Sequence, residues 1–387
     1  MALRSAESVQ TAPVAALGLI GGYLTARESG IRPLGGVVLG AAGLLAGRSW
    51  LAKTDPATTA ALSAIYLGGL RRLAPAGQEG RRLAGRPRRR RCLGCRVLRP
   101  VRPALTVATA PIALTGATGR IGGRVADRLA TKGVPLRLLV RDPDRAPDLP
   151  GATAVVAPFA DGEAVREALT GVETAFMVSA SEAADRVQQH LTFVEAAAAA
   201  GVRHLVYLSF QGASAASTFT FARDHAVTEA AIRGTGLTWT FLRDSFYADF
   251  MPGLVGDDGV IRGPGGSGRV AVVAQDDIAD AAAAVLLDPA AHAGRTYTLT
   301  GPAALSFTEI ATIVGEASGR EVTYVDETLD EARASRAVYD APDWEVAGWI
   351  STYTAVAAGE HAEVTGDVEA LTGHPATPLR EVLAAGR

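Results

Sequence analysis

From about residue 110 onward, short apolar runs alternate with stretches of helical periodicity. The apolar runs predict buried strands at 112–116, 136–140, 153–157, 174–179, 204–209 and 238–243. Helical patterns lie between them at 120–132, 162–170, 183–200 and 219–234. Continuous apolar strands separated by helices are typical of a parallel sheet that is covered on both faces. The pattern therefore predicts an α/β fold with a Rossmann-like, doubly wound parallel sheet.

The pattern becomes less regular after the sixth predicted strand. Strand-like segments at 294–301 and 321–326 flank a helical pattern at 306–318. We predict that residues from about 244 onward form a small C-terminal α/β lobe that receives the substrate. Together with the sheet, this lobe would make one unit over residues 107–387.

Residues 1–70 have a different pattern, an Ala/Gly-rich helical segment with apolar stretches at 13–26, 33–47 and 58–70. Each stretch is shorter than the roughly 20 residues that a transmembrane helix needs. None shows the polar face of an amphipathic surface helix. One interpretation is a membrane-associated segment that contacts the bilayer through residues 12–70. The alternative is a soluble helical bundle.

Residues 71–106 are rich in arginine, proline, glycine and alanine. Such a segment cannot bury a core, so we predict a disordered linker. The same composition would also arise from a GC-rich gene translated out of frame. Residues 1–106 are therefore either native to the functional protein or the product of a fusion or frameshift.

Charge and cysteine content limit the classes of function. The 387 residues carry a net charge of −2, which argues against nucleic acid as a partner. The two cysteines, Cys92 and Cys95, cannot form a disulfide framework and fit a reducing compartment. With no histidine near them, they predict no metal site. We expect residues 107–387 to be cytoplasmic, anchored to a membrane only if the N-terminal segment inserts.

A glycine-rich turn follows the first predicted strand and opens the first predicted helix. Strand, turn and helix in this order are the context of a dinucleotide phosphate site. Glycines allow the backbone to approach the pyrophosphate, and the helix N-terminus supplies N–H groups. The predicted cofactor-binding residues of this turn are Gly116, Thr118, Gly119, Arg120, Ile121 and Gly122.

The cofactor's identity follows from charge at the end of the second strand. An acidic residue there would accept from a ribose 2′-hydroxyl, whereas arginine suits a 2′-phosphate. Arg141 occupies this place and Arg120 lies in the turn, although Asp142 comes next. The sequence thus predicts NADP, with NADPH preferred over NADH.

Several motifs together resemble the NmrA-like, atypical short-chain dehydrogenase/reductase family, most closely its NADPH-dependent quinone reductase branch. They are "TGATGRIG" (115–122), "AGVRHLVYLS" (200–209), "HAVTEAAIRGTGLTWTFLRDSFYADFM" (225–251) and "VAQDDIADAAAAVL" (273–286). The resemblance covers about residues 112–385. It implies a Rossmann-like fold, NADP(H) at the carboxyl ends of the strands, and direct hydride transfer to a quinone or similar small electrophilic carbonyl.

The sequence departs from the Tyr-x-x-x-Lys pair of ordinary short-chain dehydrogenases. Phe221 and His225 stand at those positions, and the chain's two lysines, Lys53 and Lys132, lie elsewhere. We predict that His225 hydrogen-bonds the ribose or acts as a weak acid, with a plain helix histidine as the alternative. Tyr247 would line the nicotinamide or acceptor, with lobe packing as its alternative.

Three further residues are predicted to contact the cofactor. Ser179 and Ser209 end the fourth and fifth strands, where cofactors lie in such sheets. Phe159 would stack near the adenine, at a place where relatives often carry an acidic residue.

Two classes of function remain open at this point. The first is an NADPH-dependent oxidoreductase whose partner is a small acceptor, a quinone by expectation. The second is a non-catalytic, NADP-binding redox sensor that regulates a partner protein. The residues leave the acceptor open, and a homodimer is one oligomeric state that they allow.

Overall fold

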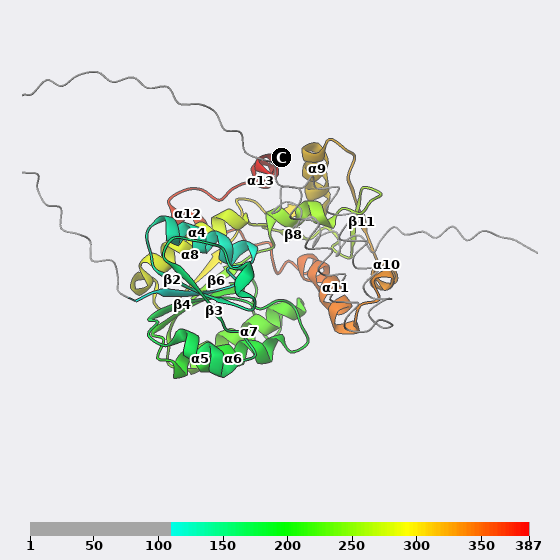
Figure 1. Ribbon diagram of the computed structural model, residues 1–387. Coiled ribbons are helices and arrows are strands. Elements are labelled where there is room, and N and C mark those ends of the chain that lie inside the picture. Colours follow the sequence, from blue (N-terminus) through cyan, green and yellow to red (C-terminus); the bar gives the residue numbers. More distant parts are fainter. Residues whose placement is uncertain (1–109, 387) are drawn as a thin grey trace, which may run out of the picture. The chain divides into compact units, whose positions relative to one another are not determined.

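The computed structural model describes residues 110–386 (Figure 1). The predictions for residues 1–70 and 71–106 lie outside this range. Within it, no helix is long and apolar enough to cross a bilayer.

A seven-stranded sheet forms the centre of the larger part of the fold. Its strands are β1 (Ile112–Thr115), β2 (Leu136–Val140), β3 (Ala152–Val156), β4 (Thr174–Val178), β5 (His204–Phe210), β6 (Thr238–Asp244) and β9 (Arg295–Leu299). They lie in the order β3-β2-β1-β4-β5-β6-β9, and every neighbouring pair is parallel. The predicted doubly wound, Rossmann-like sheet is confirmed, and the strand order changes direction between β1 and β4.

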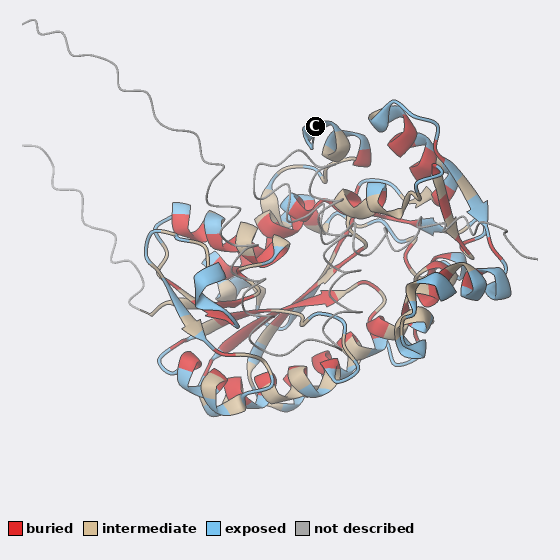
Figure 2. Ribbon diagram, turned by 45° about the vertical axis from the view of Figure 1, so that its right-hand side comes forward, coloured by how far each residue is buried: buried red, intermediate tan, exposed pale blue. Residues whose placement is uncertain are grey.

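Helices cover both faces of this sheet (Figure 1). The helices on one face are α4 (Arg120–Thr131), α8 (Gln275–Leu287) and α12 (Asp367–Thr372). The helices on the other are α5 (Gly162–Leu169), α6 (Arg186–Ala199) and α7 (Thr220–Gly234). Successive strand residues point to opposite faces, so Tyr207 packs toward α6 while its neighbour Leu208 packs toward α4 and α8. Figure 2 shows the buried strands between the inner faces of the helices.

A smaller lobe follows β6. Its strands pair as β7 (Val260–Gly263) with β11 (Thr323–Asp326), and as β8 (Arg269–Val270) with β10 (Leu305–Ser306). Its helices are α9 (Phe307–Ser318), α10 (Leu329–Arg336), α11 (Asp343–Ala357) and α13 (Leu379–Ala385). These elements surround a separate core that includes Ile261, Phe307 and Ile310.

The structure corrects the expected content of this lobe. The strand predicted at 294–301 is β9, which pairs in parallel with β6 and so belongs to the large sheet. α8 also packs on the large sheet, because Ile278 and Ala282 on its buried face share a hydrophobic core with Leu208 of β5. It contacts α4 on the same face of the sheet. Arg128 of α4 strengthens this contact by binding Asp276 and Asp280 of α8 at 2.9 and 2.6 Å.

Candidate functional site

The glycine-rich turn joins β1 to α4 at the carboxyl edge of the sheet. Gly116 has a φ of +68°, and its carbonyl accepts a hydrogen bond from the Gly119 N–H at 2.9 Å. α4 then begins at Arg120, with no side-chain hydrogen bond at its N-cap and no acidic residue in its first turn. The N–H groups of that turn and the positive end of the helix dipole form a site for an anion.

Close packing of α4 against the turn explains the third glycine. A Cβ on Gly122 would lie 2.3 Å from the Gly116 carbonyl oxygen. Ile121 is buried in the core, so only its backbone faces the turn, whereas Thr118 is half-buried and Gly119 exposed. This narrow cradle of backbone amides fits a pyrophosphate group.

The two arginines predicted to select NADP lie near this cradle. Arg141 directly follows β2, the strand next to β1, and its side chain is exposed. The guanidinium of Arg120 lies 5.9 Å from the centre of the Phe250 ring. Both positions are compatible with binding a phosphate on the adenosine ribose.

The three other residues predicted to contact the cofactor differ in how much of each is exposed to solvent. Ser179 follows β4 and is half-buried. Ser209 is completely buried, and its hydroxyl donates to Glu229 of α7 at 2.7 Å. Phe159 is half-buried, with its ring centre 4.9 Å from that of Phe193. Of these three side chains, that of Ser209 therefore points into the protein interior.

His225 belongs to a buried network between β5 and the helices α6 and α7. Its Nδ1 lies 2.8 Å from the Tyr207 hydroxyl, and its Nε2 lies 3.0 Å from a nitrogen of Arg186. Because the guanidinium can only donate, Nε2 accepts and Nδ1 carries the hydrogen. Burial, and then the Arg186 charge, lowers the pKa of His225 well below its usual range. Both ring nitrogens are thus engaged within the protein, and the ring is neutral at pH 7.

Tyr247 lies in the segment after β6, half-buried at the edge of the large core. Its hydroxyl donates to Asp244 at 3.0 Å. Burial raises the pKa of Asp244 well above its usual range, and burial with the adjacent Asp244 does the same for the phenol. Tyr247 therefore keeps its proton, which is directed at Asp244.

Within residues 110–386, four buried polar side chains that the sequence did not single out lack hydrogen-bond partners for some or all of their polar atoms. They are Gln211, Ser245, Gln275 and His361. Gln211 directly follows β5 and Ser245 directly follows β6, so both lie at the carboxyl edge where ligands bind in such sheets. Their position after a strand could have identified these two residues, whereas no local signal marks His361.

Comparison with known proteins agrees with this geometry. The NmrA-like family model matches residues 108–343, which is more than half of the chain. The chain belongs to the NmrA-like family.

Three relatives of this NmrA-like protein are reductases by name. Quinone oxidoreductase 2 of Escherichia coli K12 is 34% identical over 281 residues, covering 70% of this chain and 96% of the relative. Its crystal structure with NADPH has a TM-score of 0.65 at 32% identity, covering 71% of this chain and 99% of that one. NAD(P)H azoreductase of Xenophilus azovorans is 31% identical over 283 residues, with 71% and 97% covered. Triphenylmethane reductase of Citrobacter sp., solved with NADP(H), has a TM-score of 0.64 at 32% identity, with 71% and 100% covered.

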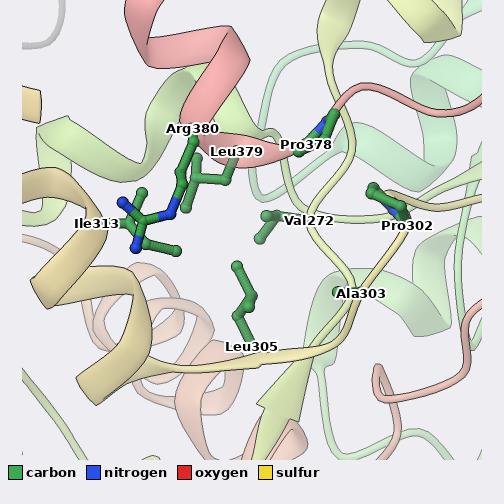
Figure 3. Close-up of a pocket in the computed structure, with 8 residues that line it drawn as sticks. All are labelled: Val272, Pro302, Ala303, Leu305, Ile313, Pro378, Leu379 and Arg380. Atoms are coloured by element: carbon green, nitrogen blue, oxygen red, sulfur yellow. The ribbon is translucent and has the colours of Figure 1, made fainter.

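An apolar pocket of about 180 Å³ lies apart from the glycine cradle of this NmrA-like protein, among elements of the smaller lobe (Figure 3). Its lining comes from α9, α13 and the segments around β8 and β10, and consists of Val272, Pro302, Ala303, Leu305, Ile313, Pro378, Leu379 and Arg380. Arg380, the only charged lining residue, already pairs with Glu316. The lining of this pocket contains no side chain that could take part in redox chemistry.

We expect the NmrA-like protein to lose stability on mild acidification. His190 is fully buried, accepts from the Ala180 N–H, and has its pKa lowered to about 3 by burial and then by Arg186. An unfolded histidine takes up a proton near pH 6.5, whereas the folded one resists it until about pH 3, so stability falls as the pH drops through this window. Between pH 6.5 and 5 this residue alone should cost about 2 kcal/mol.

Thermal melts of wild type and His190→Gln between pH 7 and 5 measure this contribution. Glutamine can still accept from Ala180 but does not titrate, so the variant's melting temperature should fall less steeply. His374→Gln is the contrasting variant, because the hydrogen bond with the Pro375 carbonyl, and then the charges of Asp277 and Asp280, raise the pKa of half-buried His374. Its protonation stabilises the folded protein below pH 6.5, so this variant's melting temperature should fall more steeply than that of wild type. Parallel pH profiles for wild type and His190→Gln would contradict the assignment.

Proposed function

We propose that this protein is an NADPH-dependent oxidoreductase that transfers a hydride to a quinone or a similar small, electrophilic carbonyl compound. The glycine cradle at the start of α4 supports a dinucleotide most directly, since a Cβ 2.3 Å from a carbonyl oxygen excludes other residues at Gly122. The reductase names of the relatives, two of them solved with the phosphorylated cofactor, support NADP and the class of reaction.

The residues of the cradle have separate roles in this proposal. The first-turn amides of α4, at Arg120 and Ile121, would hold the pyrophosphate. Arg141 and the Arg120 guanidinium would bind the 2′-phosphate as positive charges. When bound, the reduced nicotinamide supplies the hydride.

Proton supply is the step for which the site has the fewest candidates. Within residues 110–386 the sole lysine is Lys132, which caps the end of α4 opposite to the glycine turn. Tyr247 directs its proton at Asp244, and His225 would have to break a hydrogen bond to Tyr207 or Arg186 to act directly. We propose that water protonates the reduced acceptor, which is adequate for a stabilised hydroquinone anion. A catalytic role for either residue stays a prediction.

Loss of NADPH absorbance at 340 nm in the presence of a panel of quinones tests the proposal. We expect quinone-dependent oxidation that is faster with NADPH than with NADH. Arg141→Ala should reduce the preference for NADPH roughly tenfold, because it removes a cation beside the 2′-phosphate. Arg145→Ala, which removes an exposed arginine from the following turn, should leave the preference unchanged.

Each outcome of this assay has a distinct meaning. NADPH binding without oxidation by any quinone would favour the redox-sensor alternative. Failure to bind either cofactor would overturn both proposals.

Membrane contact through residues 12–70, the origin of residues 1–106 and a homodimer also stay predictions. Recovery of the expressed full-length protein entirely in the soluble fraction would contradict the membrane anchor.

A further inference from the structure

His361 combines complete burial with unpaired polar atoms. It lies after α11, its side chain is 0% exposed, and neither ring nitrogen has a hydrogen-bond partner. A neutral imidazole has one donor and one acceptor, so both functions are left unmet at a cost in folding free energy. Such an exception in a native protein requires an explanation, and a role toward a ligand is one.

Its segment is fixed at the carboxyl edge of the large sheet. Glu360 accepts hydrogen bonds from the Ser217 hydroxyl at 2.6 Å and from the Thr218 N–H at 2.9 Å, in the loop after β5. The His361 backbone carbonyl accepts from the Ala271 N–H at 2.9 Å. A Cβ on Gly212 would lie 3.5 Å from the imidazole Cε1. The ring therefore lies against the loop after β5, where ligands bind in parallel sheets.

Aromatic rings surround the imidazole. The ring centres of Phe210, Phe219 and Phe246 lie 5.5, 6.2 and 5.0 Å from that of His361, at interplanar angles of 74° to 90°. Phe210 ends β5 and Phe246 follows β6, and both are half-buried. Rotation of the Phe210 or Phe246 side chain would free a place beside the imidazole. A flat acceptor would fit this place and reach the ring of His361.

A second unpaired group lies beside His361. Gln211 is 2% exposed, and its Nε2 donates to the Glu363 carbonyl at 3.1 Å, in the same segment as His361. Its Oε1 has no partner. Two independent buried side chains in neighbouring loops thus present unmet hydrogen-bonding atoms in an aromatic setting. This combination of flat apolar walls and few polar groups suits a planar carbonyl compound.

Building on the function proposed above, we propose that the N–H of His361 hydrogen-bonds the acceptor oxygen that becomes negatively charged during reduction. The acceptor gains a hydride from the reduced nicotinamide, which is oxidised to NADP⁺. The displaced C=O electron pair moves onto the oxygen, and water then supplies the proton. Burial lowers the pKa of His361 to about 4, so at pH 7 the ring is a neutral donor. A fixed donor aimed at developing charge is an effective form of catalysis.

His361→Phe in the full-length protein tests this role, because phenylalanine preserves the aromatic packing and removes both nitrogens. We expect kcat with quinones to fall on the order of 100-fold while NADPH affinity stays the same. The melting temperature should be equal or higher, because an unpaired polar group has been replaced by an apolar one. A merely structural histidine would give the reverse result, lower stability with unchanged kcat.

A binding measurement provides a readout without turnover. 4-Nitrophenolate carries the negative oxygen of the reduced acceptor, and its dissociation constant with the NADP⁺-saturated protein is measured by equilibrium dialysis at pH 8. We expect at least tenfold weaker binding by His361→Phe, and partial recovery by His361→Gln, which restores an N–H donor. His374→Gln, at a half-buried position between α12 and α13 and outside this aromatic cluster, serves as the control.

The outcomes separate this inference from the function on which it rests. A wild-type protein that never oxidises NADPH would overturn the proposed function, whereas 4-nitrophenolate binding would still report on His361. An active wild type with unchanged kcat and phenolate affinity in His361→Phe would overturn the role of His361 alone. If His361→Phe does not fold, His361→Gln and His361→Leu are compared, and equal phenolate affinity in these two would count against the proposal.

Discussion

Gly122→Ala is expected to weaken NADPH binding on the order of 100-fold. The new methyl group would lie 2.3 Å from the Gly116 carbonyl oxygen and 2.9 Å from that of Thr115, both of which are backbone atoms. Neither can rotate away as a side chain could, so the turn or the start of α4 must shift by about an ångström. A misplacement of about 1 Å costs about a hundredfold in rate at a catalytic site. We expect a comparable loss of NADPH affinity here, equivalent to about 3 kcal/mol. Fluorescence titration with NADPH measures the change.

Gly234→Ala is the matched control for this substitution. Gly234 is the last residue of α7, and a Cβ there would meet nothing within 4 Å. Alanine should stabilise the helix end slightly and leave NADPH affinity unchanged. An equal affinity of wild type and Gly122→Ala, with both proteins folded by circular dichroism, would show that the turn does not hold the cofactor.

The sequence predicted the parts of the fold that leave a local pattern. The strands from β1 to β6 are short and mostly apolar, and the glycine turn is a contiguous motif, so each could be located from neighbouring residues. β9 was assigned to the wrong sheet for a physical reason. It is an edge strand whose residues Arg295 and Thr296 are exposed, so it lacks the continuous apolar pattern of a buried parallel strand.

The site was harder to predict because strand ends have two faces. Ser209 ends near the carboxyl edge as expected, but it shares a strand face with Tyr207, two residues earlier, and this face packs against α6 and α7. Counting alternate residues from Tyr207, which lies inside the predicted strand at 204–209, would have predicted the burial of Ser209. His361 could not have been found in this way, because its contact with Gly212 joins residues about 150 positions apart.

Glu229→Ala is expected to destabilise the protein by about 3 kcal/mol. Glu229 is 1% exposed, and its carboxylate accepts from Arg243 at 2.8 and 2.6 Å, from Ser209 at 2.7 Å and from Arg233 at 3.2 Å. Removing it leaves the Arg243 guanidinium and the buried Ser209 hydroxyl without their acceptor. The loss lies toward the low end for a buried pair because Arg243 is 25% exposed and stays partly hydrated.

The melting temperature should accordingly fall by roughly 6–12 °C in a unit of this size. Glu163→Ala is the matched control, since it breaks an i,i+3 pair with Arg166 on the exposed surface of α5 and should produce no measurable shift. Glu229→Gln keeps the shape but loses the charge, so its melting temperature should lie between those of Glu229→Ala and wild type. If Glu229→Ala had the same melting temperature as Glu163→Ala and wild type, the buried carboxylate would contribute nothing to joining α7 to β5 and β6. The attachment of α7 to β5 would then depend on other contacts, among them the hydrogen bond between His225 and Tyr207.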